Sequence, residues 1–390
     1  MSATQGNLWP SAPSPPSKLG RYRVLSPHAA VHVSPIQLGA MSLGEEWEKI
    51  GMGAMNKEQS FKLLDAYYDN GGNFIDTANN YQNETSEMLI GEWAEKRKIR
   101  DELVIATKYT ASYKIQNPDV RIKVNYVGNS KKNLYVSVEA SLKKLRTSYI
   151  DILYVHWYDH TTSVEEMMDS LHHIVSQGKA LYLGISDSPA WLVTKANQYA
   201  RDHGKTPFII YQGCWNVMER DFERDIIPMA RHEGLALAPW GVLAAGRLRS
   251  DEEEQRRQET GEKGRLLPIY GPRWERTEQE IRVSRALEKV AGEVGTKHLS
   301  AVAIAYVMQK VPFVFPIVGG RKVEHLMANL EALEITLTPE QIASLESVVP
   351  FNAGFPNTMF GDGTQYNQFY AATAALDRQP PLQAIIPSKQ

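Results

Sequence analysis

The sequence predicts a single α/β domain, a closed (β/α)8 barrel of the TIM type with long loops at its C-terminal face and an extended C-terminal tail. Eight short apolar or β-branched runs recur along the chain, and each is continuous, as in parallel strands buried on both faces. Helical patterns separate these runs, which indicates a parallel sheet. Eight such units within roughly 300 residues favour a barrel over two doubly wound domains, and no G-x-G-x-x-G turn follows the first run.

The predicted strands and helices alternate in order along the chain. The strands cover residues 33–41, 73–78, 103–109, 149–157, 180–186, 207–213, 235–241 and 313–319. The helices cover residues 56–72, 84–98, 130–147, 163–179, 189–204, 219–234, 277–295, 297–311 and 322–333. Local signals support several helix ends: Ser130 is a good N-cap, Gly71 and Gly72 stop the first helix, and Pro189 suits a first turn.

The order of elements divides the chain into an N-terminal arm at 1–32, the barrel at 33–350 and a tail at 351–390. We expect the arm to be extended and only partly ordered, because it holds five prolines and little periodic pattern. The tail is rich in aromatic and amide side chains, so we expect it to contribute to or cover a substrate pocket. Anchoring of the tail by these aromatics is the alternative.

Two connections are too long to be simple loops, at 110–130 and 244–276. Both follow strand C-terminal ends, the face on which barrels keep their active sites. The second contains a charge run at 251–265, which we expect to be a solvated loop, with a lid over a bound cofactor as the alternative.

The composition is that of an ordinary globular protein and excludes several classes. Lys and Arg number 43 against 45 Asp and Glu, so no global basic excess predicts a nucleic-acid or anionic-membrane partner. The one cysteine, Cys214, cannot form an internal disulfide and is expected to be buried. No apolar run approaches the roughly 18 residues of a membrane span, and the start lacks a secretion signal, so we expect a cytoplasmic protein.

Four ionisable side chains lie at or just beyond the ends of three adjacent predicted strands: Asp76, Tyr81, Lys108 and His156. Taken singly, they could be a turn cap, a packing aromatic, an ion-pair partner and a core histidine. Together they predict a proton donor. A phenol with a pKa near 10 is a weak acid at neutral pH, and a neighbouring ammonium lowers that pKa. The aspartate would hold the ammonium, and the histidine would orient an incoming oxygen.

The motifs around these residues resemble the aldo-keto reductase superfamily. NFIDTANNY, VIATKY, YIDILYVHW and PIVGGRKVEHLMANL stand in that family's order at its strand ends, and the resemblance runs from about Val33 to about Pro350. GISDSPAW and APWGVLAAGRL are most similar to the fungal branch that includes aryl-alcohol dehydrogenases and norsolorinic acid reductase. The resemblance implies that Asp76, Tyr81, Lys108 and His156 form the catalytic tetrad.

The resemblance also implies NADPH bound across the barrel mouth. Ser186, Asp187 and Gln212 would hold the nicotinamide carboxamide, and Trp240 would stack on the ring. The residues implied along the phosphates are Gly241, Val242, Leu243, Arg247, Gly319 and Gly320. Arg321 would bind the 2′-phosphate bidentately, with His325 and Asn329 on the same helical face. Asp187 departs from the usual asparagine, and an ionised carboxylate cannot donate to the carboxamide oxygen.

The implied activity is NADPH-dependent reduction of an aldehyde or ketone, with Tyr81 as proton donor. We expect Trp47, Tyr109 and Trp157 to bound a pocket for flat, apolar carbonyl compounds, aryl or polyketide-type. A cofactor-binding regulator of the potassium-channel β-subunit type is the alternative, because such subunits keep the tetrad. A metal-dependent barrel hydrolase is disfavoured, since no metal-ligand spacing appears.

Overall fold

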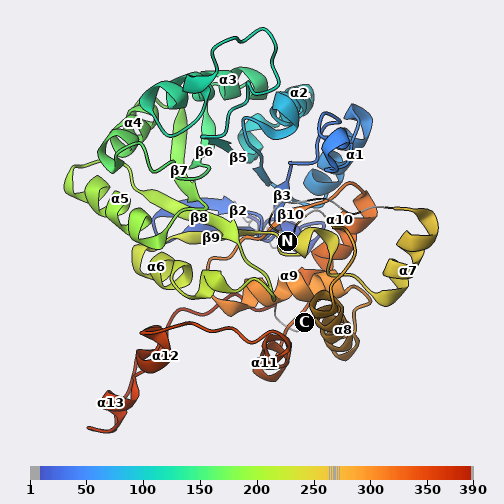
Figure 1. Cartoon of the computed structure of the whole chain (residues 1–390), viewed down its shortest axis with the longest axis vertical. Coiled ribbons are helices and arrows are strands. Elements are labelled where there is room, and N and C mark those ends of the chain that lie inside the picture. Colours follow the sequence, from blue (N-terminus) through green and yellow to red (C-terminus); the bar gives the residue numbers. More distant parts are fainter. Residues whose placement is uncertain are drawn as a thin grey trace, which may run out of the picture.

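Eight parallel strands form one sheet in this computed structural model, which describes residues 9–262, 264, 266, 269, 271 and 273–387 (Figure 1). Their order in the sheet is β10-β3-β4-β5-β6-β7-β8-β9. The bounds are β3 Gln37–Gly39, β4 Phe74–Asp76, β5 Val104–Tyr109, β6 Ile150–Val155, β7 Ala180–Ser186, β8 Phe208–Cys214, β9 Ala236–Trp240 and β10 Ile317–Gly319. The predicted parallel sheet and the barrel class are confirmed.

The segment from Phe313 to Gly319 closes the barrel by pairing with both edge strands. Its first half meets β9, where the Leu237 amide donates to the Phe313 carbonyl at 2.9 Å and the Phe315 amide donates to the Leu237 carbonyl at 2.8 Å. Its second half is β10, which pairs in parallel with β3, Ile317 opposite Gln37. The predicted eighth strand therefore pairs with β9 through its first half and with β3 through its second half.

An antiparallel hairpin of β1 (Arg23–Ser26) and β2 (Ala29–Val33) precedes the barrel. Leu25, Ala29 and Val33 are almost fully buried and belong to the same apolar cluster as Phe74 and Phe315 of the barrel interior. The prediction of an extended arm is therefore wrong from Arg23 onward, because the hairpin seals the bottom of the barrel. Residues 1–8 of the predicted arm lie outside the described part of the chain.

Helices follow the strands and surround the sheet (Figure 1). α3 begins at the predicted cap, where the Ser130 hydroxyl accepts from the Asn133 amide, and at the start of α1 Asn56 and Gln59 form a capping box. The bounds are α1 Lys57–Asp69, α2 Thr85–Arg97, α3 Lys131–Leu145, α4 Val164–Ser176, α5 Ala190–Asp202, α6 Ile226–Glu233, α7 Asp251–Thr260, α8 Glu278–Val294, α9 Leu299–Lys310, α10 Val323–Leu330, α11 Pro339–Val348, α12 Asn357–Phe360 and α13 Gln368–Ala371.

The tail runs away from the barrel mouth, along α6, and Figure 1 shows α12 and α13 projecting from the body. Arg224 donates to the Asn352 carbonyl at 3.1 Å, and Arg231 pairs with Asp362 at 3.0 Å. These contacts hold the tail on the outer side of the barrel. No helix in the described part of the chain combines the length and the apolarity needed to cross a lipid bilayer. Cys214 is partly exposed, so its predicted burial is wrong.

Candidate active site

A cavity of about 730 Å³ opens at the C-terminal ends of the barrel strands. At one end it is lined by Asp76, the last residue of β4, by Tyr81 in the loop after β4, and by His156, which follows β6. At the other end it is lined by residues of α7, of α9 and of the segment from β10 into α10. The lining thus combines a polar centre with a charged rim, which suits an extended ligand that carries its reactive group at one end.

The polar centre is built around the ammonium of Lys108. Its Nζ donates to both carboxylate oxygens of Asp76 at 2.8 and 2.7 Å, to the Thr77 carbonyl at 2.7 Å and to the Tyr81 hydroxyl at 3.3 Å. Lys108 and Asp76 are only 1% and 3% exposed. Burial lowers the pKa of Lys108, but Asp76 and Tyr81 outweigh this effect and leave the pKa above its usual value. The lysine is therefore a fixed cation.

Tyr81 and His156 present their side chains to the cavity above this cation. Their rings meet edge to face with centroids 5.9 Å apart. Burial raises the pKa of Tyr81, and Lys108 opposes that rise only in part, so the phenol stays protonated at neutral pH. The expected net lowering by the ammonium is thus outweighed by burial. Burial and Lys108 lower the pKa of His156 to about 3, so His156 is a neutral hydrogen-bonding group.

The loop that carries Tyr81 is fixed by a buried ion cluster that the sequence pattern did not reveal. Lys144 of α3 donates to the Asn79 carbonyl at 2.9 Å and pairs with Glu87 of α2 at 2.7 Å. Thr107 of β5 donates to the same Glu87 at 2.6 Å. The sequence analysis did not single out Lys144 or Glu87, because both lie within helices and not at a strand end.

Three neighbouring strand ends, β7, β8 and β9, form one hydrogen-bonded wall of the cavity. Gln212 donates to Asp76 at 2.9 Å, which ties this wall to the tetrad. Asp187 accepts from the Trp240 indole at 3.1 Å and from the Ser186 hydroxyl at 3.1 Å. Asp187, Gln212 and Trp240 line the cavity, whereas Ser186 lies fully buried behind Asp187.

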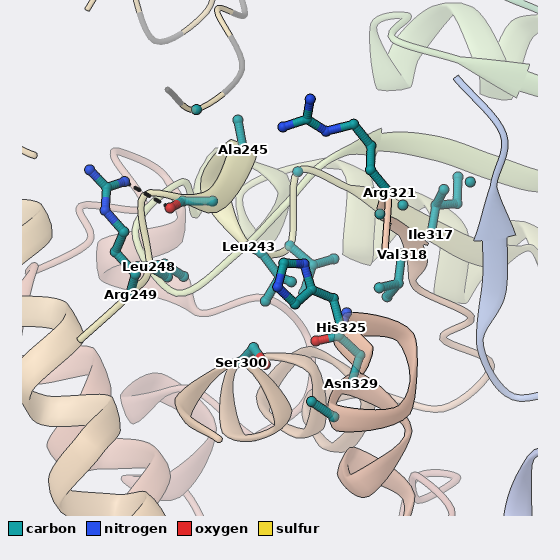
Figure 2. Close-up of a pocket in the computed structure, with 18 of the residues that line it drawn as sticks. Leu243, Ala245, Leu248, Arg249, Ser300, Ile317, Val318, Arg321, His325 and Asn329 are labelled. Carbon is teal, nitrogen blue, oxygen red and sulfur yellow. Dashed lines mark hydrogen bonds between the residues drawn. The ribbon is translucent and has the colours of Figure 1, made fainter. Parts of the chain in front are cut away.

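The opposite end of the cavity is lined by most of the residues implied for the phosphates. Figure 2 shows Arg249 and Arg321 on opposite sides, with His325 between them. Others that line it are Gly241, Val242, Leu243, Gly319, Gly320 and Asn329. Arg247 does not: it is 1% exposed and is bound to Glu280 at 3.4 Å and to the Arg273 carbonyl. The implied place of Arg247 along the phosphates is therefore wrong, and Arg249 lines the cavity instead.

The charge run after β9 forms α7 over residues 251–260, begun by a Ser250 cap. Glu253 and Arg257 on this helix line the cavity and pair with each other at 2.7 Å. The predicted loop is therefore a helix; most of its side chains are exposed as predicted, while Glu253 and Arg257 line the cavity. Leu299 and Ser300, at the start of α9, also line the cavity. The sequence did not predict this, because the first residues of a helix give no sign of the surface they face.

The three aromatics predicted to bound a substrate pocket have different places. Trp47 meets the Tyr81 ring edge to face at 6.0 Å and donates from its indole to Asn83 at 3.1 Å. Trp157 directly follows His156 in the sequence, and 36% of its surface is exposed. Tyr109 is 1% exposed and packs in the apolar core, so it does not line the cavity. The lining residues include none from the tail, which contradicts its expected place over the pocket.

The donor set also bears on metals. Within the described residues, no group of three histidine, cysteine, aspartate or glutamate side chains is placed to hold a metal ion.

Comparisons with known proteins agree with this geometry. The Aldo/keto reductase family profile matches residues 35–350. An NADP(+) aryl-alcohol dehydrogenase of Phanerodontia chrysosporium is 60% identical over 98% of this chain and 100% of that protein. Norsolorinic acid reductase A of Aspergillus parasiticus is 51% identical over 91% of this chain and 88% of that protein. A putative aryl-alcohol dehydrogenase of Saccharomyces cerevisiae is 57% identical over 91% of this chain and 94% of that protein. The chain belongs to the aldo/keto reductase family.

Proposed function

We propose that the protein is an NADP(H)-dependent oxidoreductase that interconverts an aldehyde or ketone and its alcohol. The observation that carries this proposal is the contact of the Lys108 ammonium with the Tyr81 hydroxyl at the floor of the cavity. A protonated phenol beside a fixed cation is suited to give a proton to a carbonyl oxygen as negative charge develops there.

The residues around the cavity fit this cofactor. Trp240 offers an aromatic face next to the polar centre, while Arg321 supplies positive charge at the opposite end, where Arg249, paired with Glu254, also lines the cavity. The His156 Nδ1 atom is buried without a hydrogen-bonding partner among the described residues, so the polar centre is not saturated by protein groups. When bound, the cofactor supplies the hydride.

We assign the protein side of the reaction to the tetrad. Tyr81 gives its proton to the substrate oxygen, and Lys108 stabilises the phenolate that is left. Asp76, bound by Lys108 and Gln212, keeps the ammonium in place. His156, neutral at physiological pH, hydrogen-bonds the substrate oxygen and so fixes the carbonyl orientation.

We propose flat aromatic or polyketide-type carbonyl compounds as substrates. Trp47 contacts the ring of Tyr81, and the relatives named above include an aryl-alcohol dehydrogenase and a norsolorinic acid reductase. Measuring NADPH oxidation against aryl aldehydes, aliphatic aldehydes and ketones tests this preference. Tight cofactor binding with negligible turnover on every compound would favour the regulatory alternative, which the names of the three relatives above do not suggest. Cytoplasmic location remains a prediction, to be tested by cell fractionation.

Replacing Arg321 by alanine should raise the KM for NADPH about tenfold or more. The reason is the loss of a charged hydrogen bond, worth about 1.5–3 kcal/mol, at the proposed 2′-phosphate site. The KM for NADH should change far less, because NADH lacks that phosphate. Steady-state kinetics with both cofactors provide the comparison, and an unchanged KM for NADPH would remove Arg321 from the site.

Reduction and oxidation should depend on pH in opposite ways. Burial keeps the pKa of Tyr81 above its usual value, so the acid form needed for reduction persists through neutral and moderately alkaline pH. Alcohol oxidation needs the deprotonated phenol, and its kcat should rise with pH toward that pKa. Rate profiles in both directions, from about pH 6 to about pH 10, test the assignment. An oxidation rate that does not increase over this range would contradict it.

A further inference from the structure

Asp187 places an acidic side chain at the catalytic end of the cavity. Its backbone amide donates to the Gln212 carbonyl at 3.0 Å, which anchors the residue on the β7–β8 edge. The carboxylate receives one neutral donor on each oxygen, from Trp240 and Ser186. Each donor stabilises the ionised form without neutralising its charge, because neither Trp nor Ser is a cation.

The other charges at this end of the cavity cancel. Lys108 is bound to Asp76 through both carboxylate oxygens, so that pair is neutral overall. His156 is uncharged, since its pKa is lowered to about 3. Tyr81 and Tyr211, the two phenols that interact electrostatically with Asp187, have raised pKa values and are also neutral. Among the described residues, Asp187 therefore leaves this end with a net negative charge.

We propose that Asp187 makes the site bind oxidised cofactor more tightly than reduced cofactor, and so makes bound NADPH a stronger hydride donor. This inference rests on the proposed function. The reduced nicotinamide ring is neutral and the oxidised ring is cationic, so an adjacent anion stabilises the oxidised form selectively. The ring must lie near Tyr81 because hydride and proton reach two ends of one carbonyl group. Transfer moves a hydride to the carbonyl carbon and the Tyr81 proton to its oxygen, which leaves the ring positive.

The pKa of Asp187 gives this preference a pH dependence. The carboxylate is open to water in the cavity, but the surrounding protein desolvates it enough to raise its pKa to about 6. Above that pH the anion is present and the preference for oxidised cofactor operates; below it, the preference disappears. By linkage, binding of NADP+ lowers the pKa of Asp187 and releases a proton near pH 6, whereas NADPH does not.

The experiment measures the dissociation constants of NADP+ and NADPH by quenching of tryptophan fluorescence, for the unchanged protein and for Asp187→Asn, from about pH 5 to about pH 8. Asparagine keeps an oxygen for Trp240 but carries no charge. At the upper pH, the ratio Kd(NADPH)/Kd(NADP+) should be on the order of tenfold higher in the unchanged protein than in Asp187→Asn. This ratio corresponds to a difference of about 30 mV in the reduction potential of the bound two-electron couple. At the lower pH the two proteins should give the same ratio.

Glu288→Gln is the matched control, because Glu288 is a carboxylate that lines the same cavity from α8. Its neutralisation should change both affinities in the same proportion and leave the ratio unaltered. Equal Kd ratios for the unchanged protein and Asp187→Asn at the upper pH would overturn the inference. A change of the Kd ratio in Glu288→Gln as large as the change in Asp187→Asn would overturn it as well. Should Asp187→Asn fail to fold, the pH series of the unchanged protein decides alone: a flat ratio overturns the inference. Failure of both cofactor forms to bind would instead refute the proposed function.

Discussion

Replacing Tyr81 by phenylalanine should lower kcat for carbonyl reduction about 10²–10⁴-fold, the usual contribution of a positioned general acid. The change removes one hydroxyl and leaves the ring, so the edge-to-face contacts with Trp47 and His156 remain. The dissociation constant of NADPH should therefore stay close to that of the unchanged protein. Single-turnover rates and fluorescence titration measure these two quantities separately.

Tyr154→Phe is the matched control for this prediction. Tyr154 lies fully buried on β6, and the centre of its ring is 5.9 Å from the Lys108 Nζ atom. Removal of the Tyr154 hydroxyl should leave the rate almost unchanged. A similar loss in both variants would mean that the barrel interior, and not the proton donor, has been disturbed. Near-normal turnover of Tyr81→Phe would exclude Tyr81 as the acid.

Replacing Lys108 by methionine should abolish measurable reduction and destabilise the fold by about 3–5 kcal/mol. The stability loss arises because Asp76, 3% exposed, keeps its charge without the cation that binds both its oxygens. The loss of activity arises because no ammonium remains to stabilise the Tyr81 phenolate. Urea unfolding followed by circular dichroism gives the first quantity, and NADPH oxidation gives the second.

The double variant Asp76→Asn with Lys108→Met separates the two effects. Neutral asparagine removes the uncompensated buried charge, so much of the lost stability should return while the reaction stays inactive. Equal destabilisation in the single and double variants would show that packing of the lysine chain, and not the ion pair, supports the fold here.

The barrel was predictable because a buried parallel strand leaves a continuous apolar run, which is a local signature. The ends of those runs located Asp76, Lys108 and His156 at one face without any knowledge of distances. The Tyr81 pKa could not be predicted in the same way. That pKa depends on two opposing effects, because burial raises it and the charge of Lys108 lowers it. The strength of each effect is set by the packing of several elements around the phenol.

Arg247 was misplaced for a local backbone reason. The turn before it has two residues in the left-handed region, Ala244 with φ 47° and Ala245 with φ 56°. Alanine gives no warning of such a conformation, since glycine and asparagine are the usual residues there. This turn sends the Arg247 side chain toward Glu280 and leaves Arg249 to line the cavity.

The hairpin and the tail were misread because their partners are distant in the sequence. Leu25 and Val33 sit in a proline-bearing stretch with too few apolar residues to show a period, and they are buried only against the barrel bottom. The aromatics of the tail indicate that it makes contacts. Composition does not say which surface receives them, and the structure places the tail beside α6.

The closure of the barrel also constrains how the chain can fold during synthesis. β3 pairs with β10, and the Gln37 side chain donates to the Phe315 carbonyl across 278 positions of sequence. β3 can pair with β4 early, but closure of the seam between β3 and β10 must wait for nearly the whole chain to leave the ribosome. Contacts of such long range slow folding and leave strand edges exposed meanwhile. The seam between β3 and β10 is therefore the part of the barrel that synthesis completes last.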